Sequence, residues 1–414
     1  MTHTPARAPA TGVTRVVVLD HTGALGGAEL ALVRVCEHLP RTVEIRVVLF
    51  SDGPLRGLLE KAGVTVDVVA LDDDVVTTDR TRVGRLSLRT LRGAVRLVPF
   101  SWRLARHVRS LRADVVHTTS LKADVLGIVP AAVARRPLVW HVHDRIAPDY
   151  LPGPVARAFR GLSRVAPDAV VVNSRATAGT LPRVTRVVHP GFAPEQRSDA
   201  AHHPRSPREI ALIGRISPTK GQLEAVRALP AVLAVAPDAQ LRLVGEPAFG
   251  AEDYAESVHA EVRRLGLGSS VTFVGFVPDT RAELDRASVC LHASPVPEPF
   301  GQVVVEAMVR GVPVVATRAG GVEEIMQDPE VDGPLGVLVD PGDPAALAAG
   351  LCQVLAAPQE ARADAARARE SALRRFPVAR TVEGLTEVWD QVSRRRAGSR
   401  SRRGRPARPA GSRR

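Results

Sequence analysis

The pattern that most restricts the fold is a short apolar run that leads through a glycine-containing loop into a helical pattern. Residues 16–19 have the length and β-branching of a buried strand, and Gly26-Gly27 then opens a helical pattern over 29–38. The same succession returns at residues 210–213, which a helical pattern over 220–235 follows. Strands that alternate with helices form parallel sheets covered on both faces. The sequence therefore predicts two doubly wound, Rossmann-like α/β domains.

Further β-type runs continue the alternation in both halves. Aromatic residues make up only 3% of the chain, so Val, Leu, Ala and Ile must fill the cores, which suits buried parallel sheets. A helical pattern over 251–265 lies between two of the later runs. The runs are 45–50, 64–71, 115–117, 138–142 and 169–172 in the first half, and 240–244, 271–273, 289–293, 312–316 and 336–339 in the second.

Chain length and one polar stretch place the domain boundary. A single core stops growing at roughly 250 to 300 residues, so 414 residues suit two domains. Between Phe192 and Arg208 the chain turns polar and rich in proline, and no apolar period survives. We therefore predict a disordered N-terminus (1–13), a first domain (14–193), a linker (194–208), a second domain (209–378), a last helix (379–396) and a disordered arginine-rich tail (397–414).

Cysteine usage and hydropathy indicate a soluble cytoplasmic protein. Cys36, Cys290 and Cys352 stand singly, without a CxxC pair or a Cys/His spacing typical of metal sites. Free thiols in a reducing compartment are the favoured interpretation. No stretch offers the roughly 18 uninterrupted apolar residues that a membrane-spanning helix needs.

The basic charge lies mainly at the C-terminus. The net charge is +12, and the segment from Arg394 to Arg414 contains ten arginines and no acidic residue. Such a tail is suited to anionic lipid or to non-specific contact with nucleic acid, but an unstructured solvated end explains it equally well. It predicts no specific nucleic-acid partner.

A second basic segment lies in the first half. The helical pattern over 83–111 places its arginines, from Arg82 to Arg109, close to one face. Phe100 and Trp102 on the same segment, with the apolar pair Leu97-Val98, are suited to a lipid headgroup layer. A solvated helix face is the alternative, and we expect either that or peripheral binding at the inner face of the plasma membrane.

Two loops are suited to phosphate. Gly26-Gly27-Ala28-Glu29 opens the first helix, where free backbone N–H groups attract anions. The loop that starts at Gly214 carries Arg215 and Lys220, two cations five residues apart that can converge on a diphosphate. The chain has neither a GxGxxG fingerprint nor a GxxxxGK[ST] loop, which counts against a dehydrogenase or a P-loop protein.

The strongest local pattern is a pair of glutamates, Glu298 and Glu306, in the segment EPFGQVVVE. Gly301 separates the loop that holds Glu298 from a helix that begins near Gln302 and contains Glu306. Such carboxylates can accept hydrogen bonds from two hydroxyl-bearing parts of one ligand. An inverting hydrolase is the competing chemistry, but both carboxylates belong to one loop and helix rather than flanking a bond from opposite sides.

Two histidines lie at the end of a predicted strand. His141 and His143 alternate along the strand that ends near Val142, so they share a face at the edge where ligands of open α/β sheets collect. No third ligand is in view, and we predict no metal site here. Asp72-Asp73-Asp74 is the one other acidic cluster, and we interpret it as a solvated loop.

Taken in order, the motifs resemble those of the family-4 glycosyltransferases (glycosyl transferases group 1), retaining enzymes with the GT-B fold. The resemblance covers about residues 14–395 and implies two domains that face each other across a cleft, with the last helix crossing back onto the first. The motifs are Gly26-Gly27-Ala28-Glu29, His143-Asp144, Val172-Asn173-Ser174, Pro190-Gly191, Gly214-Arg215, Lys220-Gly221, Val244-Gly245, Phe273-Val274-Gly275, Glu298 with Glu306, Gly311 to Ala316, Gly320-Gly321, Glu323-Glu324-Ile325 and Gly336 to Asp343.

The resemblance also implies roles for these residues. Arg215 and Lys220 would bind the donor diphosphate, Glu306 the ribose hydroxyls and Glu298 the donor sugar, while His143 would contact the transferring sugar. The Ile216 to Thr219 segment departs from the family, in which an acidic residue often precedes the lysine. The implied catalytic set is His143, Arg215, Lys220 and Glu298, and the implied donor-binding set is Gly26, Gly27, Gly214, Arg215, Lys220, Phe300, Gly301, Val303 and Glu306.

The expected activity follows from the resemblance. A nucleoside-diphosphate sugar is the donor, a hydroxyl of a sugar, a lipid-linked sugar or a lipid is the acceptor, and neither a cofactor nor a metal ion is required. Retention is expected without a covalent enzyme intermediate, the donor phosphate taking the acceptor proton. The alternatives are a sugar-nucleotide epimerase or a phosphorylase of the same fold, and a binding protein without activity.

Overall fold

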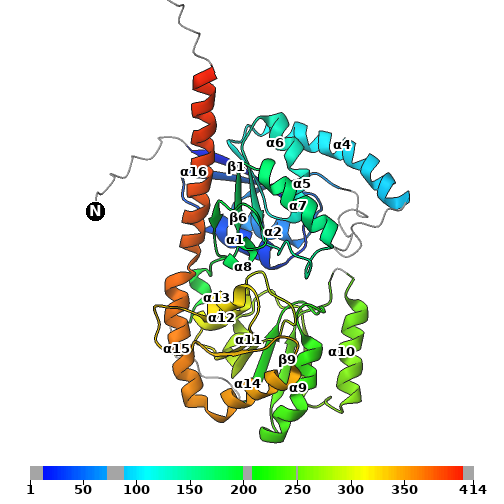
Figure 1. Ribbon diagram of the computed structural model, residues 1–414, viewed down its shortest axis with the longest axis vertical. Helices are drawn as coiled ribbons and strands as arrows, with labels where there is room; N and C mark the ends of the chain where they lie inside the picture. Colours follow the sequence, from blue (N-terminus) through cyan, green and yellow to red (C-terminus); the bar gives the residue numbers. More distant parts are fainter. Residues whose placement is uncertain (1–12, 72–87, 199–207, 249, 404–414) are drawn as a thin grey trace, which may run out of the picture.

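The computed structural model describes residues 13–71, 88–198, 208–248 and 250–403, with only the backbone described for 88–96 and 397–403. Two α/β bodies lie one above the other, and a long C-terminal helix runs beside the upper one (Figure 1). This arrangement confirms the predicted architecture of two Rossmann-like domains. In the described part of the chain, no helix is long and apolar enough to cross a membrane.

The first domain is built on a seven-stranded parallel sheet in the order β3-β2-β1-β4-β5-β6-β7. Its strands are β1 (Thr14–Asp20), β2 (Val43–Leu49), β3 (Thr65–Val68), β4 (Val115–Thr118), β5 (Leu138–Val142), β6 (Ala169–Val172) and β7 (Arg186–Val187). Its helices are α1 (Gly27–Glu37), α2 (Pro54–Lys61), α4 (Leu88–Ser110), α5 (Leu121–Leu126), α6 (Ile128–Ala134), α7 (Gly153–Val165) and α8 (Arg175–Ala178).

The side chains of β1 alternate between two cores, one on each face of this sheet. Val16 and Val18 pack with helix α1 on one face, while Val17 and Leu19 pack with α4 and α7 on the other. Both faces are therefore buried, which is why the sequence of β1 is a continuous apolar run rather than an alternation of apolar and polar residues. The four side chains are at most 3% exposed.

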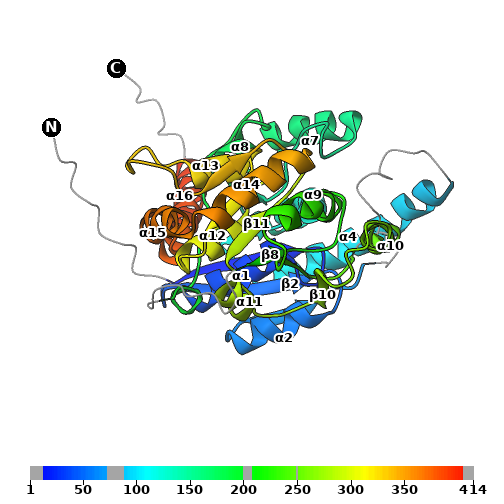
Figure 2. The same cartoon turned by 90° about the horizontal axis from the view of Figure 1, so that it is seen from below.

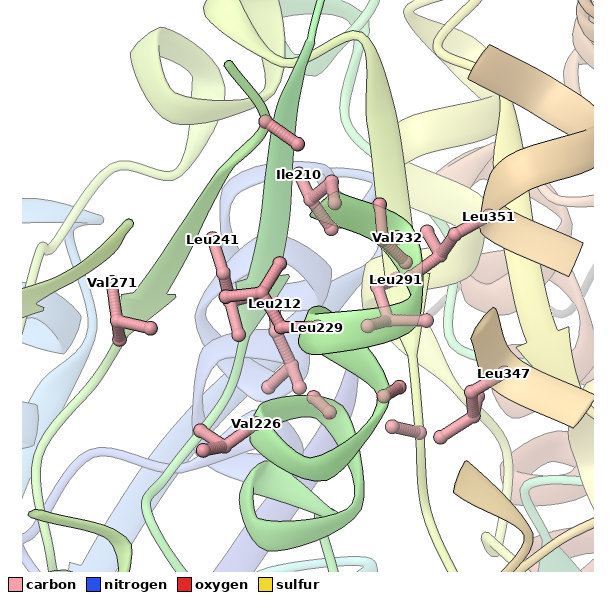
Figure 3. Packing of buried hydrophobic residues seen from close by; sticks show 14 of the residues in the cluster. Ile210, Leu212, Val226, Leu229, Val232, Leu241, Val271, Leu291, Leu347 and Leu351 are labelled. Carbon is pink, nitrogen blue, oxygen red and sulfur yellow. The ribbon is translucent and has the colours of Figure 1, made fainter. Parts of the chain in front are cut away.

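The second domain has a six-stranded sheet in the order β10-β9-β8-β11-β12-β13. Figure 3 shows Leu212 and Leu241 of the sheet packed against Leu229 of α9. The strands are β8 (Glu209–Ile213), β9 (Gln240–Val244), β10 (Val271–Gly275), β11 (Val289–His292), β12 (Val314–Thr317) and β13 (Val337–Val339). The helices are α9 (Gln222–Val235), α10 (Glu252–Arg264), α11 (Arg281–Arg286), α12 (Gln302–Val309), α13 (Gly321–Met326), α14 (Pro344–Ala356) and α15 (Pro358–Arg375).

The chain passes between the domains twice, and the two passages are hydrogen-bonded to each other. The N–H of Phe192 donates to the carbonyl of Phe376 at 2.9 Å, and the N–H of Val378 donates to the carbonyl of Phe192 at 2.8 Å. A Cβ on Gly191 would lie 2.5 Å from Cα of Val378. Glycine is therefore required for the two passages to lie this close.

Helix α16 (Val378–Arg403) completes the core of the first domain, as predicted. Val382, Leu385, Val388 and Trp389 are buried in the cluster that β1 and α1 form. Figures 1 and 2 show α15 and α16 following one another along one side of the molecule. The second half of the chain thus supplies one wall of the first domain.

Some expectations differ from the structure, and others lie outside the described residues. Helix α16 continues to Arg403, beyond the predicted end of the last helix at residue 396. Phe100 is only 2% exposed and packs edge-on against Phe50, which removes it from the proposed lipid-facing surface. Residues 1–12, the Asp72-Asp73-Asp74 cluster, most of the predicted linker (199–207) and the end of the tail (404–414) lie outside the described residues.

Candidate active site

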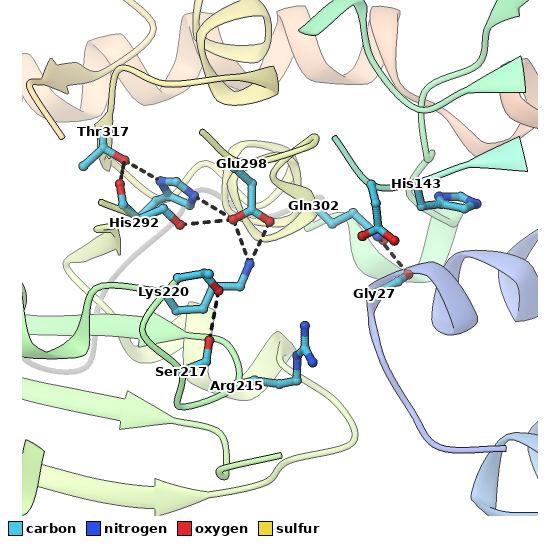
Figure 4. Close-up of polar contacts among 12 residues, drawn as sticks. Gly27, His143, Arg215, Ser217, Lys220, His292, Glu298, Gln302 and Thr317 are labelled. Carbon is cyan, nitrogen blue, oxygen red and sulfur yellow. Dashed lines mark hydrogen bonds and ion pairs between the residues drawn. The ribbon is translucent and has the colours of Figure 1, made fainter. Parts of the chain in front are cut away.

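The two domains touch where α1 and α12 begin. Gln302, the first residue of α12, donates from Nε2 to the carbonyl oxygen of Gly27 at 2.8 Å (Figure 4). A Cβ on Gly27 would lie 2.9 Å from that same nitrogen. The Gly26-Gly27 turn therefore serves the close approach of the two domains, and Gln302 is a contact that the sequence analysis did not identify.

Lys220 and Glu298 form an ion pair on the second-domain side. Lys220 Nζ lies 2.7 Å and 2.8 Å from the two carboxylate oxygens, and Ser294 Oγ donates to the same carboxylate at 3.1 Å. Burial alone would raise the pKa of Glu298, but Lys220 and His292 outweigh it and hold the pKa well below its usual value. Glu298 is thus a carboxylate anion with a fixed counterion.

The loop that carries Lys220 is held by a glycine in a left-handed conformation. Gly221 has φ +75°, and a Cβ there would lie 1.9 Å from the carbonyl oxygen of Ala293. No other residue fits that position. The contact fixes the 214–221 loop against the end of β11, which brings Lys220 and Glu298 together.

Glu306 lies apart from Glu298, in a set of contacts of its own. Its oxygens accept from Thr280 Oγ1 at 3.2 Å and from Gln196 Nε2 at 3.3 Å, and Arg34 of α1 lies 3.8 Å away. Burial raises the pKa of Glu306, and the charge of Arg34 opposes that shift. The two glutamates, only eight positions apart, therefore occupy different environments.

Arg34 was not identified from the sequence. It reaches from the first domain to Glu306, to the side-chain oxygen of Gln302 and, at 3.1 Å, to the carbonyl of Gly191. Its side chain is 12% exposed. It is the single arginine of α1, and no short motif marks it.

Arg215 points into the space between the domains, with Lys220 and Glu298 on one side and Gly27 and His143 on the other (Figure 4). Electrostatic interaction with Arg215 reaches Glu29 of the first domain. Burial and the nearby Asp20 raise the pKa of Glu29 to about 8, although Arg215 opposes the shift.

The remaining predicted residues support the two loops. Gly214 directly follows β8, and its N–H donates to the carbonyl of Val244 at 2.9 Å. Phe300 is 3% exposed and stacks on His189, so only its backbone faces a ligand, while Val303 is half-buried in α12. Gly301, with φ +111°, turns the chain into α12.

His143 follows β5 on the first-domain side. Asn173 Nδ2 donates to its backbone carbonyl at 2.9 Å, which links the ends of β5 and β6. Burial lowers the pKa of its imidazole to about 4, although Asp144 and Asp20 oppose the shift. His143 is therefore neutral at physiological pH. Within the described ranges, no group of three or more His, Cys, Asp and Glu side chains is arranged to hold a metal ion.

Comparison with known protein families covers most of the chain. The model described as Glycosyltransferase Family 4 matches residues 25–196, and the model described as Glycosyl transferases group 1 matches residues 195–371. The boundary between the two matches falls at the first passage between the domains. Together they include all strands of the two sheets except β1.

Curated relatives include two D-inositol 3-phosphate glycosyltransferases. The one from Acidothermus cellulolyticus is 30% identical over 318 residues, which is 70% of each chain. The one from Nocardioides sp. is 33% identical over 267 residues, 56% of this chain and 57% of the relative. The chain thus spans little more than half the length of several curated relatives that it matches.

The fold is shared with solved structures over nearly the whole chain. The structure of Anabaena Alr3699/HepE in complex with UDP-glucose is similar with a TM-score of 0.76 and 28% identity, covering 91% of this chain and 99% of that one. A sucrose-phosphate synthase from Thermosynechococcus elongatus is similar with a TM-score of 0.69 at 19% identity, over 92% of this chain and 99% of that one.

Proposed function

Because the chain belongs to the family-4 glycosyltransferases and has their GT-B fold, we propose that it transfers a sugar from a nucleoside-diphosphate sugar to a hydroxyl acceptor. The observation that carries this proposal is the joint position of Arg215 and the Lys220–Glu298 pair opposite Gly27 and His143. Two cations and a carboxylate anion there suit a diphosphate and the hydroxyl groups of a sugar.

The cations supply the charge stabilisation. As the bond between the anomeric carbon and the phosphate oxygen breaks, its electron pair stays on that oxygen, and Arg215 and Lys220 stabilise the departing diphosphate. The backbone N–H groups at Gly26 and Gly27, where α1 begins, add positive potential from the first domain. The 214–221 loop is already fixed before the donor binds, which lowers the cost of orienting it.

The glutamates divide the donor between them. Glu306, beside Thr280 and Gln196, holds the ribose hydroxyls, whereas Glu298, with the backbone of Phe300 and Gly301, holds the hydroxyls of the sugar. Arg34 joins Glu306 to the first domain. A nucleotide bound at Glu306 is thereby linked to both domains.

The transfer retains configuration and needs no metal ion. The acceptor oxygen forms its bond to the anomeric carbon on the face that the diphosphate leaves, and its proton passes to the departing phosphate. Glu298 is held in an ion pair with Lys220 and serves as a binding group rather than as a nucleophile. Arg215 and Lys220 take the part that a divalent cation plays in metal-dependent transferases. His143, neutral and close to the transferring sugar, accepts or donates a hydrogen bond without changing charge.

The acceptor belongs to a cell-envelope polysaccharide, a glycolipid or a glycoconjugate, and the enzyme binds the membrane peripherally. This part of the proposal is supported by one face of α4, where Val98 and Trp102 are 70% and 61% exposed and Arg106 is exposed one turn further on. An exposed indole next to cations is typical of helices that lie in a headgroup layer. The arginines of α16 and of the tail beyond it add a second contact with an anionic surface.

The test is transfer itself. Purified protein is incubated with UDP-, GDP- and ADP-sugars, with and without sugar and lipid-linked acceptors, and both the nucleoside diphosphate and the glycosylated acceptor are measured. Equimolar release of the two products supports the proposal. Interconversion of sugar nucleotides without acceptor would identify an epimerase, phosphate-dependent cleavage would identify a phosphorylase, and binding without turnover would identify a protein without activity.

A further inference from the structure

Three histidines near the carboxyl ends of β4 and β5 form a continuous series of ring contacts, called the stack below, in which His117 and His141 meet edge-on. His117 lies in β4, His141 in the neighbouring strand β5, and His143 directly after β5. The ring centroids of His117 and His141 are 5.3 Å apart, and those of His141 and His143 are 4.0 Å apart. The stack therefore leads from the interior of the domain to the imidazole that we assign to the transferring sugar.

The inner end of the stack rests on the C-terminal helix. Trp389 of α16 donates from Nε1 to Nδ1 of His117 at 3.3 Å, and the two rings meet edge-on with centroids 5.6 Å apart. Trp389 and His117 are each 1% exposed and His141 is 6% exposed. Residues 272 positions apart are thus joined in a water-excluded contact.

The contact with Trp389 defines the state of the stack. An indole N–H only donates, so Nδ1 of His117 must be an acceptor and its proton must lie on Nε2. Burial lowers the pKa of His117 to about 3 and the pKa of His141 well below its usual value, so both rings are neutral. Three neutral rings in contact have little freedom to tilt, because each is confined by the next.

A small cavity lies beside the rings, between α1 and α16. Its volume is about 20 Å³, and it is lined by the three histidines, by Ala28 and Leu32 of α1 and by Leu385 and Trp389 of α16. Of these two helices, α16 supplies the hydrogen bond and the edge-on ring contact to His117.

We propose that Trp389, acting through His117 and His141, is a positioning residue for His143, so that the C-terminal helix sets the geometry of the sugar-transfer site. This inference rests on the proposed function, in which His143 contacts the transferring sugar. Trp389 touches no substrate. It acts on the chemical step rather than on donor binding, because Arg215, Lys220 and Glu306 lie outside the stack.

The first test separates positioning from simple stability. Trp389→Phe keeps an aromatic ring and removes the N–H donor, while Val392→Ala, a change on the same buried face of α16, leaves the stack untouched. We expect Trp389→Phe to lower kcat at least tenfold with donor KM and nucleoside diphosphate affinity within twofold, and Val392→Ala to lower Tm without that loss. The proposal would be overturned if Trp389→Phe and Val392→Ala lost equal amounts of kcat at equal losses of Tm. An unchanged kcat in Trp389→Phe would also overturn it.

A double-mutant cycle tests the route through His143. Because Trp389 acts through the imidazole, Trp389→Phe should lower kcat no further in a His143→Ala background. If the two losses multiply, Trp389 acts independently and the proposal is wrong.

A readout that needs no turnover keeps this inference distinct from the proposed function. The ring ¹⁵N signals of His143, assigned by comparison with His143→Ala, should shift or broaden in Trp389→Phe and stay in place in Val392→Ala. Unchanged His143 signals in Trp389→Phe would contradict positioning even if the wild-type protein transfers no sugar, while shifted signals in an inactive wild type would leave only the activity assignment in error.

Discussion

Lys220 Nζ lies within 2.8 Å of both carboxylate oxygens of Glu298, in a pair whose side chains are 24% and 16% exposed. The cation assigned to the diphosphate therefore has a partly buried counterion before any donor arrives. A donor must share Lys220 with Glu298 rather than find it solvated. The same pair means that a change at either residue affects stability, because the partner is left as an unpaired buried charge.

Substitution of Arg215 should test diphosphate stabilisation more directly than substitution of Lys220, which is paired with Glu298. Arg215→Ala should lower kcat/KM by about 10² or more, the scale of losing one preorganised charge contact, while Tm stays close to that of the wild type. Lys220→Ala should lower both quantities, and Lys220→Met combined with Glu298→Gln should recover Tm without activity. Steady-state kinetics and thermal unfolding check this, and near-normal turnover in Arg215→Ala would refute the assignment.

Glu298 and Glu306 should respond differently to the same substitution. Glu306→Gln removes the anion beside Thr280 and Gln196, so it should weaken nucleoside diphosphate binding by roughly tenfold, the effect of one charge-assisted hydrogen bond. Glu298→Gln should leave that affinity within about twofold, although transfer falls, because its assigned contact is to the sugar. Isothermal titration with the diphosphate, followed by transfer assays, distinguishes the two, and equal losses of affinity would contradict the division.

Removal of divalent cations should leave the reaction intact. Arg215 and Lys220 provide the positive charge at the diphosphate, so activity in excess EDTA should match activity in Mg²⁺ or Mn²⁺. A metal-dependent glycosyltransferase assayed beside it shows that chelation is complete. Activity that disappears in EDTA and returns with either cation would overturn the metal-independent mechanism.

Acid should destabilise the protein through the buried histidines. In the unfolded chain a histidine takes up a proton near pH 6.5, whereas burial lowers the folded pKa of His117 to about 3 and that of His143 to about 4. Between these values the unfolded state binds more protons, so the free energy of unfolding falls as pH falls, by up to about 1.4 kcal/mol per pH unit for each histidine. The slope is half developed at about pH 6.5, nears its full value roughly one pH unit lower, and is lost again below the folded pKa values.

His117→Gln should remove the contribution of His117 to the pH dependence of the free energy of unfolding. Gln still offers an oxygen acceptor to Trp389 but does not titrate. Urea unfolding at pH 7.5, 6.5 and 5.5 gives the slope for both proteins. An unchanged pH dependence in the variant would show that His117 is not the buried base described here.

Membrane binding should require both basic segments and weaken with salt. Co-sedimentation with anionic vesicles should retain the full-length protein at low salt and release it at high salt, and neutral vesicles should not retain it. Trp102→Ser tests the exposed face of α4, and a protein ending at Ser393 tests the tail. A variant with Arg85, Arg89, Arg92 and Arg96 changed to Gln tests the arginine face, of whose side chains the structure describes none. If the full-length protein does not co-sediment with anionic vesicles at low salt, the membrane proposal is wrong.

Local patterns were sufficient to predict the fold. Residues 138–142 and 169–172 were predicted as strands because both are short and largely apolar, and each matches its strand end to end. The GT-B arrangement followed from the order of the motifs. The crossover of the last helix followed from the family resemblance, whereas its apolar stripe predicted only a helix that packs on another part of the fold. Trp389 was missed because a single aromatic residue beside that stripe carries no periodic signal.

The contacts between residues far apart in the chain could not be predicted in this way. Arg34 and Gln302 are 268 positions apart, and Trp389 and His117 are 272 apart, so no spacing along the chain relates them. Phe100 was placed on a lipid-facing surface with Trp102 because both are aromatic and close in sequence. Residues two positions apart on a helix lie on different faces, so Phe100 is buried in the core while Trp102 is exposed to solvent.

The return of α16 onto the first domain has a consequence for how the protein is made. The first domain leaves the ribosome before the second, and domains usually fold in that order. Here Val382, Leu385 and Trp389 belong to the first domain's buried cluster but follow the whole second domain in the chain. Until they emerge, β1 and α1 expose apolar surface that α16 later covers. The N-terminal domain, translated first, can therefore be completed only after the second domain has been translated.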